Sequence, residues 1–138
     1  MTDPNRALLS HFFGCLNRHD LESAAAVLAP ECQILGLACR PLQVDEWLQA
    51  LDALFDSVPE ARYTINDTVA EGDRLAVRHT FAGTHLARLG SVPPSGRRVQ
   101  VEGAIVLRVH DGHIVEAWLS ADFFGVLQQI GAISIPEF

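Results

Sequence analysis

The first part of the chain shows the spacing of hydrophobic positions that is typical of amphipathic helices. Asp3-Pro4 resembles a helix start, with a capping carboxylate followed by proline in the first turn. Behind it, hydrophobic residues recur every three or four positions: Leu8, Leu9, Phe12, Phe13 and Leu16. The pattern predicts further helices over residues 21–28, capped by Asp20, and within residues 41–60, with a short strand at 31–36 between them.

From Arg62 onward the pattern alternates with the two-residue period of a strand. Strands are predicted at 62–70 and 74–85 around a turn at 71–73, and at 99–109 and 114–121 around Asp111-Gly112. A last helix is predicted over 122–129, with Gly131 as its stop. The order predicts an α+β fold in which three N-terminal helices pack on a strongly curved, mostly antiparallel sheet.

Length and composition favour one domain over residues 1–138, with a hydrophobic content of 49% that excludes disorder. The net charge is −7, and all ten basic residues are arginines, so the chain lacks the clustered basic surface that nucleic-acid binding needs. No apolar run approaches the roughly 20 residues of a membrane span. The N-terminus does not resemble a signal peptide, so we expect a cytoplasmic protein that binds neither nucleic acid nor membrane.

The predicted hairpin around Asp111-Gly112 fixes which side chains share a face, if its turn has two residues. Residues opposite one another then have numbers that sum to 223, which places Ile105, Glu116, Trp118 and Asp122 on one face. Because that face is the more apolar along its first strand, we expect it to point inward.

The hairpin of residues 62–85 gives a second inward face with two histidines, His79 and His85, on either side of Phe81. Arg74 and Arg78 lie on the opposite face, which is predicted to be exposed to solvent. A carboxylate at the end of an inward strand face, with histidines on a neighbouring strand, makes a candidate acid/base site.

Each of these residues also has a structural interpretation. Asp122 precedes a helix, where aspartate is a preferred N-cap. His79 and His85 are compatible with hydrogen-bonded core histidines, Glu116 with an ion pair, and Trp118 with a core or pocket-wall aromatic residue. The sequence leaves both interpretations open.

Metal binding is not expected. His79 and His85 are six residues apart, and no closer histidine pair accompanies them. The three cysteines, Cys15, Cys32 and Cys39, have spacings that match no zinc pattern, and we interpret them as small buried hydrophobic residues.

Two segments resemble the SnoaL-like polyketide cyclase and ester cyclase family: GTHLARLGSVPPSGRRV at 83–99 and HDGHIVEAWLSADFFGVLQQIG at 110–131. The resemblance is strongest over residues 71–131. It implies the cone-shaped α+β barrel of nuclear transport factor and ketosteroid isomerase, with a deep apolar pocket, and commonly a homodimer. It also implies acid/base catalysis by the aspartate at the position of Asp122, without metal or cofactor.

The chain departs from that pattern at Ile105, where anthracycline-type cyclases usually have histidine, and near Ile34, where a polar residue is frequent. The resemblance implies a cofactor-free enzyme acting on a small hydrophobic carbonyl compound, by cyclase-like aldol closure or by isomerase or lyase-type proton transfer. Asp122, His85 and His79 are the expected catalytic residues, and the expected substrate contacts are Trp118, Glu116, Phe81, Ile105 and Trp47.

Two alternatives stay open. One is a binding protein for hydrophobic ligands with the same fold and no chemistry. The other is a hydratase or epoxide hydrolase, which typically needs an inward arginine between carboxylates. Arg74, Arg78 and Arg108 are all predicted to face outward.

Overall fold

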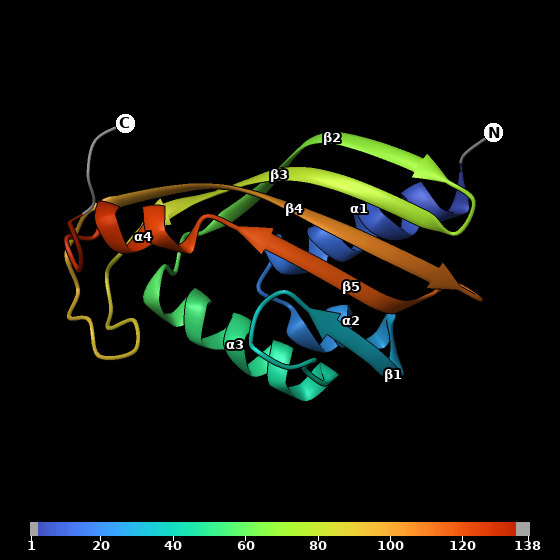
Figure 1. Cartoon of the computed structure of the whole chain (residues 1–138), viewed down its shortest axis with the longest axis horizontal. Helices are drawn as coiled ribbons and strands as arrows, with labels where there is room; N and C mark the ends of the chain where they lie inside the picture. Colours follow the sequence, from blue (N-terminus) through green and yellow to red (C-terminus); the bar gives the residue numbers. More distant parts are fainter. Residues whose placement is uncertain (1–2, 135–138) are drawn as a thin grey trace.

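The computed structural model describes residues 3–134. It contains a curved five-stranded sheet that is covered on one side by helices (Figure 1). The elements are α1 (Pro4–Asn17), α2 (Leu21–Ala26), β1 (Leu28–Leu35), α3 (Val44–Ser57), β2 (Arg62–Glu71), β3 (Arg74–Thr84), β4 (Arg98–His110), β5 (His113–Ala121) and α4 (Phe123–Gln129). The predicted α+β class is confirmed. Within residues 3–134, no helix is both long and apolar enough to cross a membrane.

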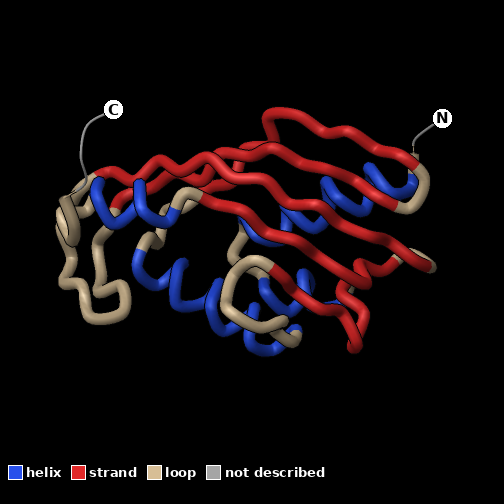
Figure 2. Tube along the Cα trace, viewed as in Figure 1, coloured by secondary structure: helices blue, strands red, loops and turns tan. Residues whose placement is uncertain are grey.

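The sheet has the order β1-β5-β4-β3-β2. Its three hairpin-type pairings are antiparallel, and β1 runs parallel to β5 at one edge. The sheet is therefore mostly antiparallel, as predicted. Helices α1, α2 and α3 lie on one side of it, and α4 lies at the end where β4 begins and β5 ends (Figure 2).

The core forms where α1 and α3 meet the inward face of the sheet. Phe12 of α1 is fully buried, and the centre of its ring lies 5.7 Å from the ring centre of Trp47 on α3. Val77 and Leu107, on β3 and β4, complete the same cluster. Burial of this apolar stripe against the sheet stabilises helices whose length alone would leave them marginal.

The start of β1 differs from the prediction. The strand begins at Leu28, not at residue 31, and α2 ends at Ala26. Pro30 is tolerated within it because β1 is an edge strand that needs backbone donors on one side only. The Ile114 N–H of β5 donates to Val27 O at 2.8 Å and so begins the parallel pairing early.

Two side-chain amides complete strand edges that have no neighbouring strand. Asn17, at the end of α1, accepts from Tyr63 N at 2.7 Å and donates to Tyr63 O at 2.9 Å, on the outer edge of β2. Gln129 of α4 does the same for Gln100 N and O, at 2.7 and 2.9 Å, where β4 extends past the end of β5. These bonds fix α1 and α4 to opposite edges of the β2–β3–β4 ladder, near the same end of its strands, since unpaired strand edges need partners.

The β4–β5 hairpin has the predicted turn, with Asp111 and Gly112 at φ values of 50° and 74°. Val109 lies opposite Ile114, as expected from a two-residue turn. The pairing then shifts by one residue, so that within the described β4–β5 ladder Val115 has no opposite residue. This β-bulge reverses the faces of every later residue of β5.

The predicted inward orientation of Glu116 and Trp118 is therefore wrong. Beyond the bulge, Ile105 pairs with Leu119, and Glu116 pairs with Arg108. The Glu116 carboxylate lies 3.9 Å from the Arg108 guanidinium, and the Arg74 guanidinium lies 5.8 Å from the Trp118 ring centre. Both side chains belong to the outer face of the sheet, which carries the arginines.

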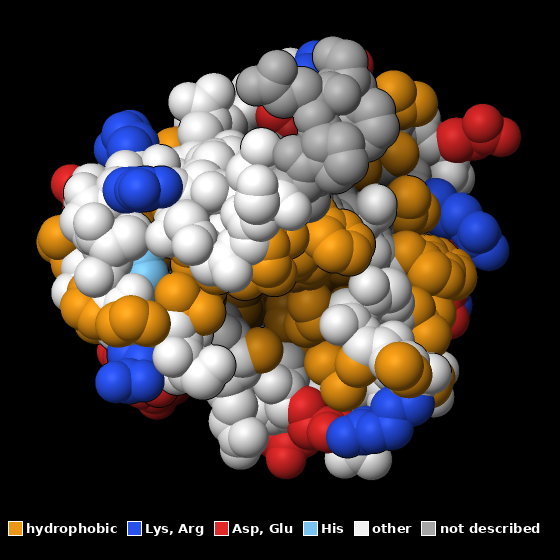
Figure 3. Space-filling view, turned by 60° about the vertical axis from the view of Figure 1, so that its left-hand side comes forward, with side chains coloured by type: hydrophobic (Ala, Val, Ile, Leu, Met, Phe, Trp, Pro, Cys, Tyr) orange, Lys and Arg blue, Asp and Glu red, His pale blue; other side chains and the backbone are white. Residues whose placement is uncertain are grey.

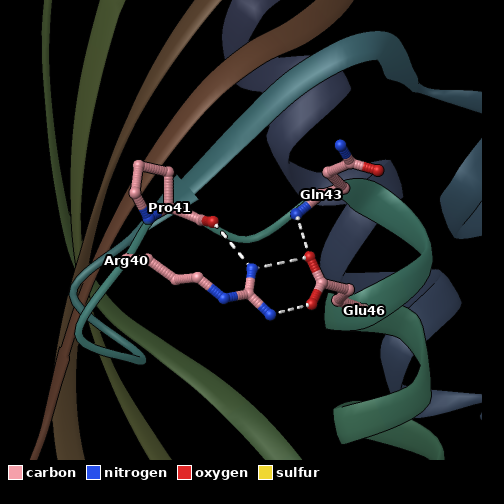
Figure 4. Close-up of polar contacts among 4 residues, drawn as sticks. All are labelled: Arg40, Pro41, Gln43 and Glu46. Carbon is pink, nitrogen blue, oxygen red and sulfur yellow. Dashed lines mark hydrogen bonds and ion pairs between the residues drawn. The ribbon is translucent and has the colours of Figure 1, made fainter.

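The segment between β1 and α3 is held to the start of α3 by an ion pair (Figure 4). The Arg40 guanidinium donates to both carboxylate oxygens of Glu46, and also to Pro41 O at 3.2 Å. Glu46 accepts in addition from Gln43 N at 3.1 Å. The Arg40 guanidinium, helped by the Gln43 N–H, lowers the pKa of Glu46 to about 2.

This ion pair predicts a titration that can be followed by carboxyl-carbon NMR. Glu46 should titrate near pH 2 in the protein, and Arg40→Gln should move its midpoint upward, toward about 4.3, the ordinary value for glutamate. Because the folded-state pKa is lowered, the stabilisation is present above about pH 4.3 and is lost as the pH falls through the folded pKa. An unchanged midpoint in Arg40→Gln would show that the guanidinium is not the cause.

Candidate functional site

An apolar cavity of about 260 Å³ lies between the sheet, α3 and α4. Figure 3 shows a hollow in the surface whose visible lining is hydrophobic. Trp47 and Leu51 contribute from α3, Phe81 from β3, Val126 from α4, and Ile130 from the C-cap of α4. Among the described residues that line the cavity, none is Asp, Glu, Lys or Arg. A concave, mostly apolar site with a few polar groups is typical of small-molecule binding.

Five of the residues predicted for the site line this cavity together: Trp47, His79, Phe81, His85 and Ile105. Alternation along β3 brings His79 and Phe81 to its inward face, and His85, which directly follows the strand, is buried on the same side, as the sequence pattern predicts. Trp118 and Glu116 do not line it, because the β-bulge turns them to the outer face.

Asp122 is an exposed residue at the junction of β5 and α4. Its Oδ1 accepts from Gly125 N at 2.8 Å, which makes it the N-cap of α4. Glycine is favoured at 125, because a Cβ there would lie 2.2 Å from Asp122 Oδ2. The neighbours Ala121 and Phe123 line the cavity, whereas Asp122 itself does not. The geometry therefore gives Asp122 a capping function, and its predicted catalytic role stays a prediction.

His79 is a buried imidazole within a cluster of aromatic rings. It is 6% exposed, and the ring centres of Tyr63 and Phe13 lie 5.3 and 6.0 Å from its own. Opposite it, Gly103 leaves the necessary room, since a Cβ at 103 would lie 2.8 Å from His79 Cε1. Among residues 3–134, nothing hydrogen-bonds to its Nδ1. Burial lowers the pKa of His79, so the ring is neutral at pH 7.

His85 is fully buried, and its hydrogen bonds fix its tautomer. The Ser95 N–H donates to His85 Nδ1 at 3.1 Å, and Ser95 Oγ lies 2.9 Å from the same atom. Because Nδ1 accepts, the proton of the neutral ring is on Nε2. That Nε2 has no hydrogen-bond partner in the described part of the chain.

The loop that carries Ser95 is fixed to the rest of the protein on both sides. His85 N donates to Arg97 O at 2.9 Å, and Gly96 N donates to His85 O at 2.8 Å. Near the end of α3, Ser57 Oγ donates to Arg88 O at 2.7 Å. These hydrogen bonds hold His85 and the loop around Ser95 in one position.

Tyr63 is a cavity residue that the sequence analysis missed. It is the only tyrosine in the chain, and alternation along β2 would have placed it on the inward face. Asn17 fixes its backbone through two hydrogen bonds, and its ring packs edge-to-face on His79. Burial raises the pKa of Tyr63, so its hydroxyl keeps its proton at all ordinary pH values.

The described residues 3–134 contain no group of three or more His, Cys, Asp or Glu side chains arranged to hold a metal ion. Of the three cysteines, Cys15 and Cys32 are buried as predicted, and Cys39 is exposed, which corrects the prediction for that residue. The polar side chains among the described lining residues are two imidazoles, the phenol of Tyr63 and the hydroxyl of Ser120.

Comparison with known proteins agrees with this architecture. The sequence model of the SnoaL-like polyketide cyclase family matches residues 7–130. No curated protein gives a significant match to the chain.

Several solved structures are similar over nearly their whole length. IdmH from Streptomyces antibioticus, a candidate polyketide cyclase, is 29% identical, with a TM-score of 0.82 over 92% of this chain and 98% of that chain. TsrD from Streptomyces laurentii is 27% identical, with a TM-score of 0.83 over 96% and 100%. AclR from Streptomyces galilaeus, a candidate hydroxylase, shares the fold at 24% identity, with a TM-score of 0.88 over 94% and 97%.

Proposed function

The chain belongs to the SnoaL-like polyketide cyclase family, and we propose that it is a cofactor-free enzyme that transfers protons on a small hydrophobic carbonyl compound. Family and fold support a function of cyclase or isomerase type. The observation that carries the proposal is the buried, neutral His79, whose Nδ1 is unpaired among the described residues and which borders an apolar cavity beside Tyr63. Unpaired buried polar atoms are rare and need a functional or structural reason.

In the proposed reaction, His79 removes a proton from the carbon next to a carbonyl group. The C–H electron pair forms a C=C bond while the carbonyl π pair moves to the oxygen, which gives an enolate whose oxygen accepts a hydrogen bond from the Tyr63 hydroxyl. The enolate carbon then attacks a second carbonyl of the same molecule, and the resulting alkoxide takes the proton back from His79. Return of the proton to another carbon instead gives an isomerisation.

The apolar wall suits this chemistry. A neutral base with a lowered pKa is ready at pH 7, and hydrogen bonds to a developing enolate are stronger where water is excluded. His85 presents a fixed N–H donor, so it can orient the substrate but cannot act as a base at Nε2.

The test is deuterium incorporation next to the carbonyl group of a panel of apolar ketones, followed by NMR in heavy water. The protein should catalyse exchange of at least one ketone well above the buffer rate. Absence of exchange across the panel, with ketones shown to bind, would instead support the second candidate, a hydrophobic-ligand binding protein. The observation that favours this candidate is the apolar character of Ile34 and Ile105, both buried.

Asp122 is the alternative acid/base group, and two substitutions separate its possible roles. Asparagine caps helices as well as aspartate, so Asp122→Asn should keep both α4 and ketone exchange. Asp122→Ala should lower the free energy of unfolding by about 1 kcal/mol in urea denaturation, because Gly125 N loses its acceptor. If Asp122→Asn folds normally and loses exchange, the carboxylate is the base and His79 is not.

A further inference from the structure

Two buried imidazole nitrogens, on histidines that line the same cavity, have no partner among the described residues. They are Nδ1 of His79 and Nε2 of His85. Leaving a buried polar atom unpaired destabilises a protein, so such atoms usually meet a ligand or an ordered water. The rest of the lining is almost entirely hydrophobic.

The two histidines cannot bind the same atom of a ligand. His79 lies on the inward face of β3 and His85 directly follows the strand, six residues further on, which corresponds to about 20 Å along an extended chain. The extended ladder continues to the second histidine, since His85 N donates to Arg97 O and Gly96 N donates to His85 O. An imidazole side chain is much shorter than half of this span. Phe81 lies between the two on the same face, so the cavity wall that separates the two histidines is apolar.

We propose that the natural substrate is an elongated, uncharged molecule with an oxygen function at each end, one held beside His79 by the Tyr63 hydroxyl and the other bound by His85. This inference rests on the proposed function in taking the cavity as the substrate site. The His79 end, beside Tyr63, is the reacting end. The His85 end holds a remote oxygen that accepts a hydrogen bond from Nε2–H, and the middle of the molecule is hydrocarbon.

The absence of charged side chains from the described cavity wall excludes a charged substrate. A carboxylate or ammonium group buried there would lose its hydration without gaining a partner. A carbonyl or ether oxygen needs only one donor, and the fixed Nε2–H of His85 is such a donor. Both nitrogens are buried in the free protein, so binding requires small movements of the neighbouring atoms.

The test is calorimetric titration of the full chain with straight-chain diketones that have one ketone next to each terminal methyl group. Each diketone is compared with the monoketone of the same chain length. A diketone long enough to reach both histidines should bind about tenfold more tightly than its monoketone, because it satisfies a second buried polar atom. Diketones too short to span the cavity should show no such advantage.

One variant assigns the gain to His85. In His85→Phe an aromatic ring is kept and the donor is removed, so the long diketone and its monoketone should bind equally. If His85→Phe does not fold, nitrogen NMR of the unmodified protein replaces it: the long diketone should shift the ring-nitrogen resonances of both histidines.

Equal affinity of diketone and monoketone in the unmodified protein would overturn the proposal, as would an advantage that persists in His85→Phe. A water molecule bound at either nitrogen, undisturbed by any ketone, would overturn it as well. Because these titrations measure binding alone, they stand apart from the exchange assay. Failure of proton transfer with a preserved diketone advantage would contradict only the proposed function.

Discussion

His79→Phe is expected to slow ketone deuterium exchange by about 100- to 10,000-fold, the range over which general acid/base groups act. The substitution keeps an aromatic ring among Tyr63 and Phe13 and removes both ring nitrogens. It also removes a buried nitrogen that is unpaired in the described structure, so the melting temperature should stay the same or rise. Loss of activity without loss of stability is the signature of a residue kept for chemistry.

The matched control is His113→Phe, the same change at an exposed position at the tip of the β4–β5 hairpin, which should leave the exchange rate unaltered. If His79→Phe instead lowers stability and leaves exchange intact, His79 is a packing residue and the proposed base is wrong. Comparison of the two variants by thermal unfolding and exchange NMR separates these cases.

The pH dependence follows from the same burial. Because burial lowers the pKa of His79, the neutral base should persist below about pH 6.5, the ordinary value for histidine, and the exchange rate should fall only at lower pH. Stability follows the same direction. The unfolded chain takes up the proton more readily than the folded one, so stability is full above about pH 6.5 and declines as the pH falls below it.

The two hairpins show where sequence patterns suffice and where they do not. Along β3 and the residue after it, alternation places His79, Phe81 and His85 inward, and all three are buried in the cavity wall. On β5, the same rule fails after the bulge at Val115, because a single extra residue exchanges the two faces. The sequence contains a signal for the exchanged faces. Between Glu116 and Ala121, the polar residues Glu116 and Ser120 both occupy even-numbered positions, which favours the even-numbered side chains as the outer face.

The error at the bulge matters for the site. The predicted inward orientation of Asp122 depends on counting alternate residues from the Asp111-Gly112 turn, and it loses that support because the register shifts at the bulge. The N-cap alternative was visible in the sequence, and the bond to Gly125 N matches it. Tyr63 and the Ser95 contact that fixes the His85 tautomer depend on long-range packing, so local periodicity could identify neither their partners nor their roles.

Gly36→Ala is expected to lower the free energy of unfolding by about 3 kcal/mol, a large part of the stability of a domain of this size. Gly36 has a φ of 89°, and a Cβ there would lie 2.1 Å from the backbone oxygen of Leu119. Strain at a positive φ and overpacking against the backbone of β5 contribute about 1–2 kcal/mol each.

Gly72→Ala is the matched control: its φ is also positive, at 59°, but nothing lies within 4 Å of the added Cβ, so only about 1 kcal/mol should be lost. Since Leu37 and Leu119 both line the cavity, Gly36→Ala should also weaken ketone binding, and Gly72→Ala should not. Equal losses of unfolding free energy in the two variants would mean that the close approach of the segment after β1 to β5 is not what holds this wall of the cavity in place.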